Sequence, residues 1–314
     1  MSFKFDFSDD DEEEEVDYRH LADSKRFKIP AAPQAVKPKR ECLPFSEITV
    51  ADVALTWREK NELFSIEQTS ERATGHPSVS YIQVHEPAEK LAKTLKDAKL
   101  RTSDLIAGKY EGGMTLWECS VDLMAHMSGE RVRGKRVVEL GCGFGLPGLL
   151  AHQLGARSVH FQDYNASVIN SVTAPSCVLQ SYGGDGSDFH AFMTSYENSG
   201  GFRFFAGDWG QLADNVSPRT YDVILTSETI YDEANYEKLH DVLKLMLEPH
   251  SGVVLVAAKS FYFGVGGGVD SWMNYVRNRG YFLVENVKEI DEGLTRNILE
   301  MTVKEGALDN KWIK

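Results

Sequence analysis

From residue 121 onwards, short apolar runs alternate with stretches whose apolar residues are spaced three or four positions apart. The first pattern predicts buried strands, and the second predicts amphipathic helices. The predicted strands are residues 136–140, 158–163, 202–206, 221–227, 252–259, 281–287 and 296–304. The main predicted helices are residues 120–127, 166–178, 233–247 and 269–279, and a further helical pattern begins at Leu149.

The order of these elements predicts an α/β fold. Five strands separated by helices indicate a parallel sheet with right-handed crossovers. The last two strands have only residues 288–295 between them, which is too short for a crossover helix, so we expect them to form an antiparallel pair at the sheet edge. The sequence therefore predicts a seven-stranded, mostly parallel, Rossmann-like sheet with an antiparallel edge strand and an N-terminal extension.

The N-terminal part of the chain differs in composition from the rest. Residues 1–44 combine an unbroken acidic run with lysine, proline and alanine, and we expect a disordered acidic tail there. Residues 45–120 carry strand-like runs at 62–68 and 79–84 and a helical pattern at 87–98. This pattern predicts an N-terminal extension that packs on the main domain and carries a lid over its ligand.

The main domain is expected at residues 121–306, followed by a C-terminal tail at 307–314. Within it, residues 183–201 are rich in glycine and serine, which predicts a mobile loop. We expect a monomer, because the sequence shows no evident apolar stripe for self-association.

Charge and cysteine content exclude several classes of function. The net charge is −13, which disfavours nucleic acid as a direct partner, because binding phosphates needs a basic face. A basic protein partner is favoured by long-range attraction, while the acidity also serves as a plain solubility device. No apolar run reaches the length of a membrane span, and the acidic N-terminus is unlike a signal peptide.

The four cysteines lie far apart, without a Cys-x-x-Cys motif or a histidine cluster. We therefore expect no metal site and reduced thiols, which indicates the cytoplasm or nucleus. Residues 37–40, KPKR, are either a short nuclear import signal or a solvated basic patch.

The stretch RVVELGCGFGLPG at residues 136–148 is the most informative motif. Gly141, Gly143 and Gly145 follow a predicted strand and precede a helix, where glycines permit positive φ angles and close approach of a ligand to the backbone. No Gly-Lys-Ser/Thr follows, so a phosphate-binding P-loop is disfavoured. The carboxylate of Glu139 beside the loop suits a cationic, amino-acid-like ligand such as S-adenosylmethionine.

Polar residues also follow the next strands, whose carboxyl ends meet at the ligand edge of such a sheet. Asp163 is expected to accept the ribose hydroxyls, with Asn165 as the cap of the next helix. Asp208 is expected either to accept the adenine amino group or to cap a helix. The fourth strand ends in TSETIY at residues 226–231, facing the methyl donor and the substrate. Residues 112–118, GGMTLWE, are either a lid or a packing segment around a tryptophan.

Together these motifs resemble the seven-strand class I methyltransferases, and within them the eukaryotic protein-histidine methyltransferases that act on large-subunit ribosomal protein L-three. The resemblance is carried by MSFKFDF, YEGGMTLWEC, VVELGCGFGLPG, HFQDYN, GDW, ILTSETIY, KSFYFGVGGGV and IDEGLTR. It implies S-adenosylmethionine as cofactor and a histidine ring nitrogen as methyl acceptor. The expected cofactor-binding residues are Leu116, Trp117, Glu118, Cys119, Ser120, Glu139, Gly141, Gly143, Gln162, Asp163, Tyr164, Asn165, Gly207, Asp208, Trp209 and Ser227.

Three residues are candidates for catalysis. Glu228 stands where related lysine methyltransferases have the aspartate of Asp-x-x-Tyr, so the role of that aspartate does not transfer directly. A neutral imidazole needs no strong base, but an acceptor for the hydrogen on its other nitrogen would select the tautomer and stabilise the developing charge. Glu228 is expected either to do this or merely to hold its loop or touch the cofactor. Tyr231 and Tyr262 are expected to shape the pocket.

The predicted function is S-adenosylmethionine-dependent transfer of a methyl group to a histidine of a basic ribosomal protein, in the cytoplasm and nucleus, without direct binding of nucleic acid or membrane. Two alternatives stay open from the sequence. One is a protein-lysine methyltransferase of the same fold. The other is a ribosome-assembly or escort factor that binds the cofactor and makes little product, for which the acidic run at residues 9–15 is suited.

Overall fold

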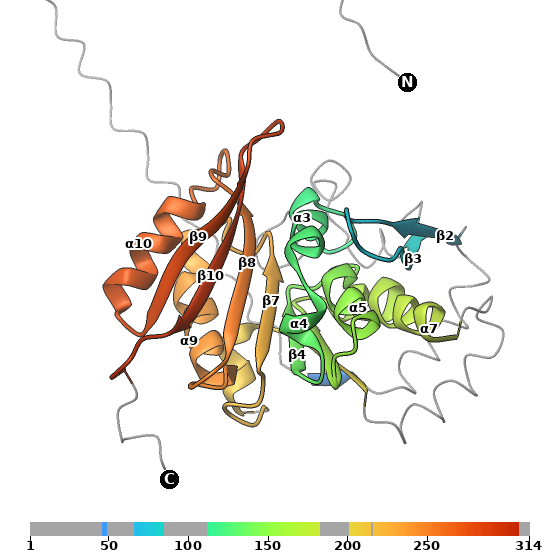
Figure 1. The fold of residues 1–314 in the computed structure, drawn as a ribbon, viewed down its shortest axis with the longest axis horizontal. Helices are drawn as coiled ribbons and strands as arrows, with labels where there is room; N and C mark the ends of the chain where they lie inside the picture. Colours follow the sequence, from blue (N-terminus) through green and yellow to red (C-terminus); the bar gives the residue numbers. More distant parts are fainter. Residues whose placement is uncertain (1–45, 49–65, 85–111, 183–200, 215, 308–314) are drawn as a thin grey trace, which may run out of the picture. The chain divides into compact units, whose positions relative to one another are not determined.

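The computed structural model describes residues 46–48, 66–84, 112–182, 201–214 and 216–307. Eight strands within these ranges form one sheet: β1 Ser46–Ile48, β4 Arg136–Leu140, β5 Ser158–Asp163, β6 Phe202–Ala206, β7 Val223–Ser227, β8 Val253–Lys259, β9 Phe282–Ile290 and β10 Arg296–Val303. Their spatial order is β1-β6-β5-β4-β7-β8-β10-β9 (Figure 1).

The five central strands are parallel, and their order places a ligand site. Counted along the chain, β4 to β8 are the first to fifth strands, and they lie side by side in the order 3-2-1-4-5. The winding direction therefore reverses between β4 and β7. In open α/β sheets, ligands bind at the carboxyl ends of the strands at this reversal. The predicted Rossmann-like, mostly parallel arrangement is confirmed, although the sheet has eight strands among the described residues where seven were expected.

Both edges of the sheet differ in detail from the prediction. A short strand, β1, pairs antiparallel with β6 and extends one edge. At the other edge, β10 lies between β8 and β9 and pairs antiparallel with both, so the antiparallel strand is one position in from the edge. Burial explains this order: Ile298, Leu299 and Met301 of β10 are fully buried, whereas Leu283 of β9 is half-exposed.

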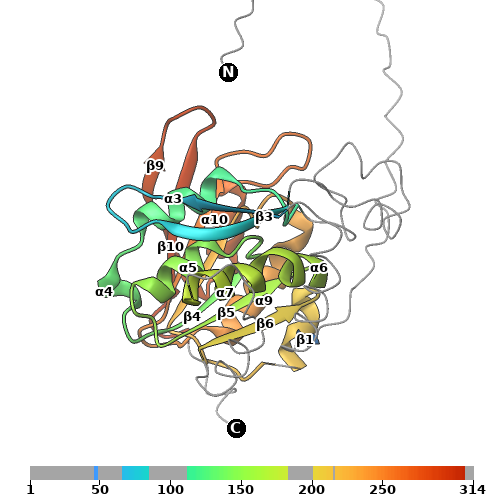
Figure 2. The ribbon, with the colours of Figure 1, turned by 90° about the vertical axis from the view of Figure 1, so that its right-hand side faces the viewer.

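Helices cover both faces of the sheet. They are α3 Glu118–His126, α4 Gly129–Val132, α5 Leu146–Gln153, α6 Ala166–Val168, α7 Ala174–Tyr182, α9 Tyr236–Met246 and α10 Val269–Arg279, with a π-helical turn η3 Ile169–Thr173 and 3₁₀ turns η4 Trp209–Asp214 and η5 Glu233–Asn235. Buried residues of α3, α5 and α7 share one apolar cluster, and those of α9 and α10 share another. Figure 2 shows α5 and α7 side by side along β4, β5 and β6.

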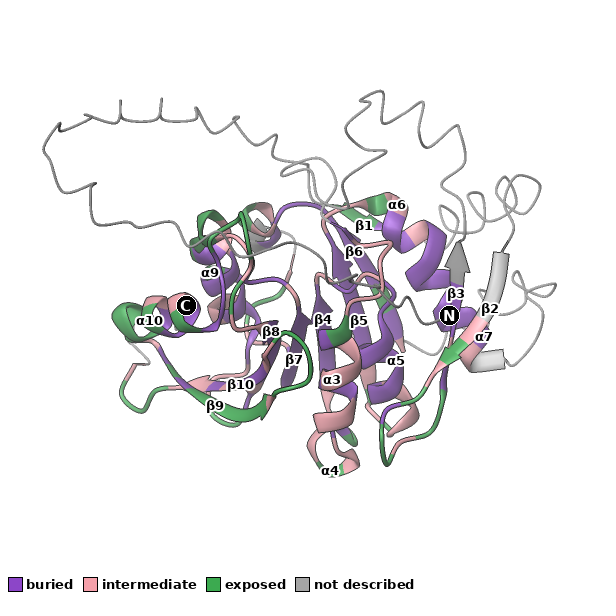
Figure 3. Cartoon of the chain, turned by 90° about the horizontal axis from the view of Figure 1, so that it is seen from above, coloured by how far each residue is buried: buried purple, intermediate pink, exposed green. Residues whose placement is uncertain are grey.

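Successive side chains along the central strands point to opposite faces of the sheet and so contribute to the two apolar clusters in turn. Val137 packs into the cluster of α3, α5 and α7, whereas the next residue, Val138, packs into the cluster of α9 and α10. Because both faces are covered, the central strands are buried along nearly their whole length, as Figure 3 shows for β4, β5 and β7. Their carboxyl ends are therefore the part of the sheet left for a ligand.

The helix predicted at residues 166–178 is present but interrupted. It consists of α6, the π-helical turn η3 and α7, and Pro175 lies in the first turn of α7. A proline inside a helix lacks the backbone N–H and clashes with the carbonyl of the preceding turn, which favours a wider turn at that place. The wider turn includes Thr173, whose hydroxyl donates to the carbonyl of Gly143 in the glycine loop at 2.5 Å.

A small hairpin of the N-terminal extension packs on the main sheet's helices. Strands β2 Ile66–Glu71 and β3 Val79–Val84 pair antiparallel. The backbone of Ile82 donates to Ser176 of α7 at 2.9 Å, and Tyr81 contacts Phe144 of the glycine loop edge-on, with ring centroids 5.3 Å apart. The predicted tail 1–44, the helix 87–98 and most of the loop 183–201 lie outside the described residues, so the proposed domain boundaries stay predictions.

We expect the contact between α5 and β5 to tolerate no added methyl group. A Cβ on Gly148 would lie 2.4 Å from Cε1 of Phe161 and 2.8 Å from Oε2 of Glu139. Gly148→Ala should therefore lower the free energy of unfolding by about 1–3 kcal/mol, measured by urea denaturation. Gly129→Ala is the control, since its Cβ would meet nothing closer than 3.6 Å. Equal stability of the two variants would contradict the packing described here.

Candidate functional site

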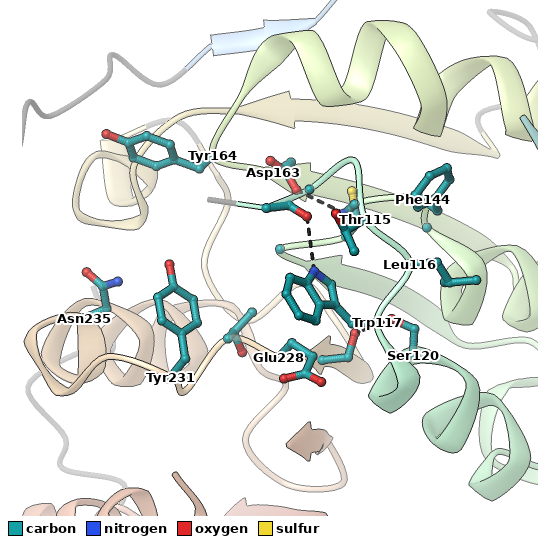
Figure 4. A pocket seen from close by; sticks show the side chains of 18 of the residues that line it. Thr115, Leu116, Trp117, Ser120, Phe144, Asp163, Tyr164, Glu228, Tyr231 and Asn235 are labelled. Carbon is teal, nitrogen blue, oxygen red and sulfur yellow. Dashed lines mark hydrogen bonds between the residues drawn. The ribbon is translucent and has the colours of Figure 1, made fainter. Parts of the chain in front are cut away.

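A cavity opens at the carboxyl ends of β4, β5, β6 and β7, at the reversal of the strand order (Figure 4). Its walls come from the glycine loop after β4, the turns after the next three strands, the segment before α3 and the start of α9. The lining residues are Gly112, Gly113, Thr115, Leu116, Trp117, Ser120, Gly141, Cys142, Gly143, Phe144, Gly145, Leu146, Asp163, Tyr164, Gly207, Asp208, Trp209, Ser227, Glu228, Thr229, Tyr231, Asn235 and Lys238.

The glycine loop is held by a carboxylate of the neighbouring strand. Asp163, the last residue of β5, accepts a hydrogen bond from the backbone N–H of Gly143 at 3.0 Å through Oδ2. Its Oδ1 accepts from the N–H of Asn165, also at 3.0 Å. Gly143 has φ 51°, and a Cβ there would lie 3.1 Å from the carbonyl oxygen of Gly113. The loop therefore needs glycine both for its backbone angle and for the close approach of the segment before α3.

Asp163 lines the cavity as predicted, whereas Asn165 does not. Asn165 occupies the N-cap position of α6, but its side chain makes no capping hydrogen bond. Instead, the Asp163 carboxylate accepts from the N–H of Asn165. The capping role expected of the Asn165 side chain is therefore wrong.

Asp208 caps a turn, which is one of the two roles that the sequence left open, and it also lines the cavity. Its Oδ1 accepts from the N–H of Gly210 at 2.8 Å, which caps the turn η4. Its Oδ2 forms an ion pair of 2.7 Å with Nζ of Lys238 from α9, and both side chains line the cavity. A ligand in this part of the cavity therefore meets a carboxylate and an ammonium group together.

Gln162 lies behind the cavity wall, not in it. Its side chain is buried and accepts from Nε1 of Trp209 at 2.7 Å, while its Nε2 donates to the carbonyl of Gly207 at 2.9 Å. Gln162 is absent from the lining. The expected direct contact with a cofactor is therefore replaced by a positioning role, in which one amide holds the turn after β6.

Glu139 also lies away from the cavity. Its side chain is completely buried under the start of α5, where Oε2 accepts from the N–H of Gly148 at 2.8 Å. Burial raises the pKa of this carboxyl from 4.5 to about 8, although the hydrogen bond from Gly148 opposes the shift. A carboxyl enclosed under α5 and absent from the cavity lining does not reach a ligand there, so the direct contact expected of Glu139 is not possible in this structure.

The segment before α3 brings a tryptophan over the cavity. The indole N–H of Trp117 donates to the carbonyl of Gly112 at 3.2 Å, and Nζ of Lys259 lies 5.0 Å from the centre of its ring. Leu116, Trp117 and Ser120 line the cavity as expected. Glu118 and Cys119 do not: the first faces solvent and the second is buried under the segment.

Glu228 lines the cavity where β7 ends, in a strained backbone conformation. Its φ is 57°, in the left-handed region, which non-glycine residues rarely adopt and which costs on the order of 1–3 kcal/mol. Its N–H continues the sheet by donating to the carbonyl of Ala257 at 2.9 Å. Strained residues of this kind cluster at functional sites. The conformation places the Glu228 carboxylate beside the Trp117 ring (Figure 4).

Two neighbours hold the Glu228 carboxylate. The hydroxyl of Tyr262 donates to Oε2 at 2.5 Å, and Nζ of Lys259 lies 3.4 Å from Oε1. Burial and the charge of Glu228 raise the pKa of Tyr262 well above its usual range, so the phenol remains a donor. Burial alone would lower the pKa of Lys259, but the charges of Glu228 and Glu118 outweigh it and raise that pKa.

One oxygen of this carboxylate is left without a hydrogen bond. Oε1 of Glu228 is buried and has no hydrogen-bond partner among the residues that the structure describes, although Lys259 offsets part of its charge and the Cys119 thiol interacts with the same carboxylate. Buried polar atoms are nearly always hydrogen-bonded, so an exception at a cavity wall indicates a place for a donor from outside the chain.

Tyr231 lines the cavity next to Glu228, and Tyr262 lies behind both. The ring centroids of Tyr231 and Tyr262 are 6.2 Å apart in an edge-on arrangement. The three residues predicted for catalysis are therefore brought together, with only Tyr262 outside the lining. Lys259 was missed by the sequence analysis; its place at the end of β8, next to the end of β7, was the signal for it.

In the described part of the chain, groups of three or more residues able to hold a metal ion do not occur. Its helices are all too short or too polar to cross a membrane.

Comparisons with known proteins show that the chain is similar to protein methyltransferases. Residues 199–262 match a family described as lysine methyltransferase. The chain is 42% identical to the histidine protein methyltransferase 1 homolog of Rattus norvegicus over 64% of its length, and 34% identical to that of Dictyostelium discoideum over 65%. These alignments cover 59% and 62% of the two relatives, so the chain spans about three fifths of the relatives it matches.

A solved structure, magnesium protoporphyrin IX methyltransferase from Synechocystis, covers 60% of this chain at 14% identity with a TM-score of 0.44, and 83% of that chain is matched. The sequence matches confirm the resemblance to protein-histidine methyltransferases that the motifs predict.

The buried carboxyl of Glu139 predicts a particular pH dependence of stability. Because its pKa is raised on folding, the folded chain holds a proton that the unfolded chain loses between pH 4.5 and about 8. The free energy of unfolding should therefore fall as the pH rises through this window. Between pH 5.5 and 8, the decrease in the free energy of unfolding should be smaller in Glu139→Gln than in the parent by at least about 1 kcal/mol. Urea denaturation measures this difference. Parallel pH profiles of parent and variant would refute the assignment.

Proposed function

We propose that this chain is an S-adenosylmethionine-dependent protein-histidine methyltransferase. The single observation that carries the proposal is the Glu228 carboxylate at the cavity wall, with one buried oxygen lacking a hydrogen bond and a lysine ammonium beside it. The similarity to histidine protein methyltransferase 1 homologs supports the same activity. S-adenosylmethionine, when bound, supplies an electrophilic methyl group.

Two features of the cavity support this cofactor. A Cβ at Gly141 would lie 2.6 Å from Thr229, and one at Gly143 would meet the backbone of Gly113, so the loop is kept free of side chains where a ligand comes close. Asp163 stands at the end of the second parallel strand, where an acidic residue binds ribose hydroxyls in dinucleotide folds. Each carboxylate oxygen has a second lone pair beyond its backbone hydrogen bond.

The remaining cofactor contacts are proposed along the same edge. The carboxylate of Asp208 and the Trp209 ring suit the adenine, and Leu116, Trp117, Ser120 and Ser227 suit the methionine part. The hydroxyls of Ser120 and Ser227 are 2.9 Å apart, so they join the start of α3 to the end of β7. Tyr164 and Gly207 complete this wall.

A neutral acceptor is favoured over a charged one. Lysine is a cation at neutral pH and would have to lose a proton first, whereas imidazole is mostly neutral there. A lone carboxylate would bind a lysine ammonium, but Lys259 already offsets the charge of Glu228 at 3.4 Å. Lys259 also lies 3.3 Å from the exposed carboxylate of Glu118, so it offsets only part of the charge of Glu228, which remains a hydrogen-bond acceptor with less negative charge than a lone carboxylate. An imidazole N–H matches such an acceptor.

The chain's own residues would then position the ring and stabilise its charge. Glu228 accepts the hydrogen on the nitrogen that does not react, which fixes the tautomer and aims the other nitrogen at the methyl group. Positive charge develops on the ring during transfer, and a carboxylate held in place stabilises it without reorganisation. Tyr262 and the strained backbone keep Glu228 in place. Tyr231 and Trp117 exclude water from the cavity.

A basic protein of the large ribosomal subunit, of the L-three type, is the substrate that we propose. The net charge of −13 supports a basic partner, and the motif resemblance supports this particular one. A monomer in the cytoplasm and nucleus is proposed on the same sequence grounds. The rival activity, lysine methylation, is favoured by the description of the family that residues 199–262 match.

This function is tested by incubating the purified chain with radiolabelled S-adenosylmethionine and an extract from cells that lack the enzyme. We expect label in a ribosomal protein, and mass spectrometry of the labelled band should place the methyl group on histidine. A methyl group on lysine would assign the rival activity. Glu228→Gln should lower turnover on the order of 10²-fold, because an amide accepts the ring hydrogen without a stabilising charge.

The matched control is Glu285→Gln, an exposed glutamate on β9 that should leave turnover unchanged. Turnover of Glu228→Gln within a few-fold of the parent would remove the orienting role from Glu228.

A further inference from the structure

The loop that follows β8 exposes two large aromatic side chains beside the cavity. Phe261 and Phe263 are 53% and 77% exposed, with their rings edge-on at 5.1 Å, and Val265 is 38% exposed. Single exposed apolar residues are ordinary, but a cluster on one loop marks a surface for a partner. We call residues 261–266 the aromatic loop.

The aromatic loop is anchored at both ends. At its start, the N–H of Ser260 donates to the carbonyl of Thr295 at 2.9 Å. At its far end, the N–H of Gly267 donates to the carbonyl of Tyr231 at 3.0 Å, where a Cβ would lie only 2.3 Å from the carbonyl oxygen of Ile230. Gly267 therefore serves the packing of the chain on itself.

Because the loop is anchored at both ends, successive side chains point in opposite directions. Tyr262 points inward to the carboxylate of Glu228, whereas Phe261 and Phe263 on either side of it face solvent. Gly264 and Gly266 have φ angles of 82° and 94° and open space around them. The loop therefore presents its two phenylalanines at a fixed place, one residue away from a side chain that holds the proposed catalytic carboxylate.

The surface around the aromatic loop is acidic. Asp291 and Glu292, in the β9–β10 turn that contacts Ser260 through Thr295, are exposed, as is Glu233 beside Tyr231 and Asp270 at the start of α10. None of these four acids forms an ion pair with a described residue. Two cations close to this surface are already paired, Lys259 with Glu228 and Glu118 and Arg296 with Asp122, whereas Lys288 on β9 is exposed. An approaching basic segment would meet acceptors, and an acidic one would be repelled.

We propose that the aromatic loop and the acidic turn at residues 291–292 form the docking surface for the protein substrate. The occupant is a basic surface segment that carries an apolar anchor for Phe261 and Phe263 near its target histidine. Docking there places the segment at the rim formed by Tyr231, so one side chain can enter the cavity. This inference rests on the proposed function and adds to it the chemistry of the substrate segment.

The test uses the full chain with purified ribosomal protein L-three as probe. In Phe261→Ser/Phe263→Ser, we expect KM for L-three to rise about tenfold or more, with kcat within a factor of about two, because the anchors contribute to binding and not to the chemical step. The control is Leu283→Ser. Leu283 is 49% exposed but pairs with Thr302, at the opposite end of β9 from the acidic turn, so its KM should match the parent value.

The acidic turn gives a second readout. Asp291→Lys/Glu292→Lys should raise KM several-fold at low ionic strength, and the difference should shrink at about 0.5 M salt, because exposed charges are screened. Binding of L-three without cofactor, followed by fluorescence anisotropy, should weaken in the same variants. Unchanged thermal midpoints confirm that both double variants are folded.

The outcomes separate the two proposals. A parent chain that binds L-three through the loop without methylating it refutes the proposed function alone. Unchanged KM and binding in Phe261→Ser/Phe263→Ser overturn the docking inference, as does a parent chain that does not bind L-three. A parent chain that dimerises while the double variant is a monomer would assign the loop to a second copy and overturn it equally.

Discussion

The carboxylate of Asp163 is the constraint on which the cavity depends. It stands at the end of β5 and accepts the backbone N–H groups of Gly143 and Asn165, each at 3.0 Å. These two bonds join the glycine loop after β4 to the turn after β5, so the ends of two neighbouring strands keep one geometry. Without such an acceptor, the loop's N–H groups would need water or a ligand.

A second set of contacts supports the same edge from behind. Gln162 holds Trp209 and Gly207 after β6, and Thr173 holds the carbonyl of Gly143 from the π-helical turn. All of these bonds are made within the chain, so the fold itself positions the groups along this edge.

The chemistry of the site depends on how charge is balanced at Glu228. The left-handed backbone, the Tyr262 hydroxyl and the Lys259 ammonium fix a buried carboxylate while leaving Oε1 without a hydrogen bond. Such an arrangement costs stability, because a buried polar atom without a partner is expensive. Proteins retain such a loss of stability mainly at sites where function requires it.

Strand ends were the part of the site that the sequence could predict. Asp163, Asp208, Ser227 and Glu228 follow apolar runs of a parallel sheet, and parallel strands bring their carboxyl ends to one edge. The cofactor contact predicted for Glu139 failed because this residue lies one position before the end of β4. Side chains alternate between the two faces of a sheet, and that of Glu139 points under α5.

Contacts between distant segments could not be predicted in this way. Lys259 and Tyr262 reach Glu228 from the end of β8 and the loop after it, and no local pattern specifies that meeting. Pro175 is a local signal for the interruption of the helix at η3. The contact of Thr173 with Gly143 that results from the interruption depends on tertiary packing. The position of β10 between β8 and β9 likewise follows from the greater burial of β10 than of β9, and this difference in burial arises only when the sheet is assembled.

Calorimetric titration of S-adenosylhomocysteine, the demethylated cofactor, into the purified chain tests the central claim most directly. The account predicts saturable binding with one site per chain, weakened at least about tenfold in Asp163→Ala, because that variant loses both the ribose acceptor and the anchor of the glycine loop. A parent chain that shows no binding, or equal affinity in the folded Asp163→Ala variant, would contradict it.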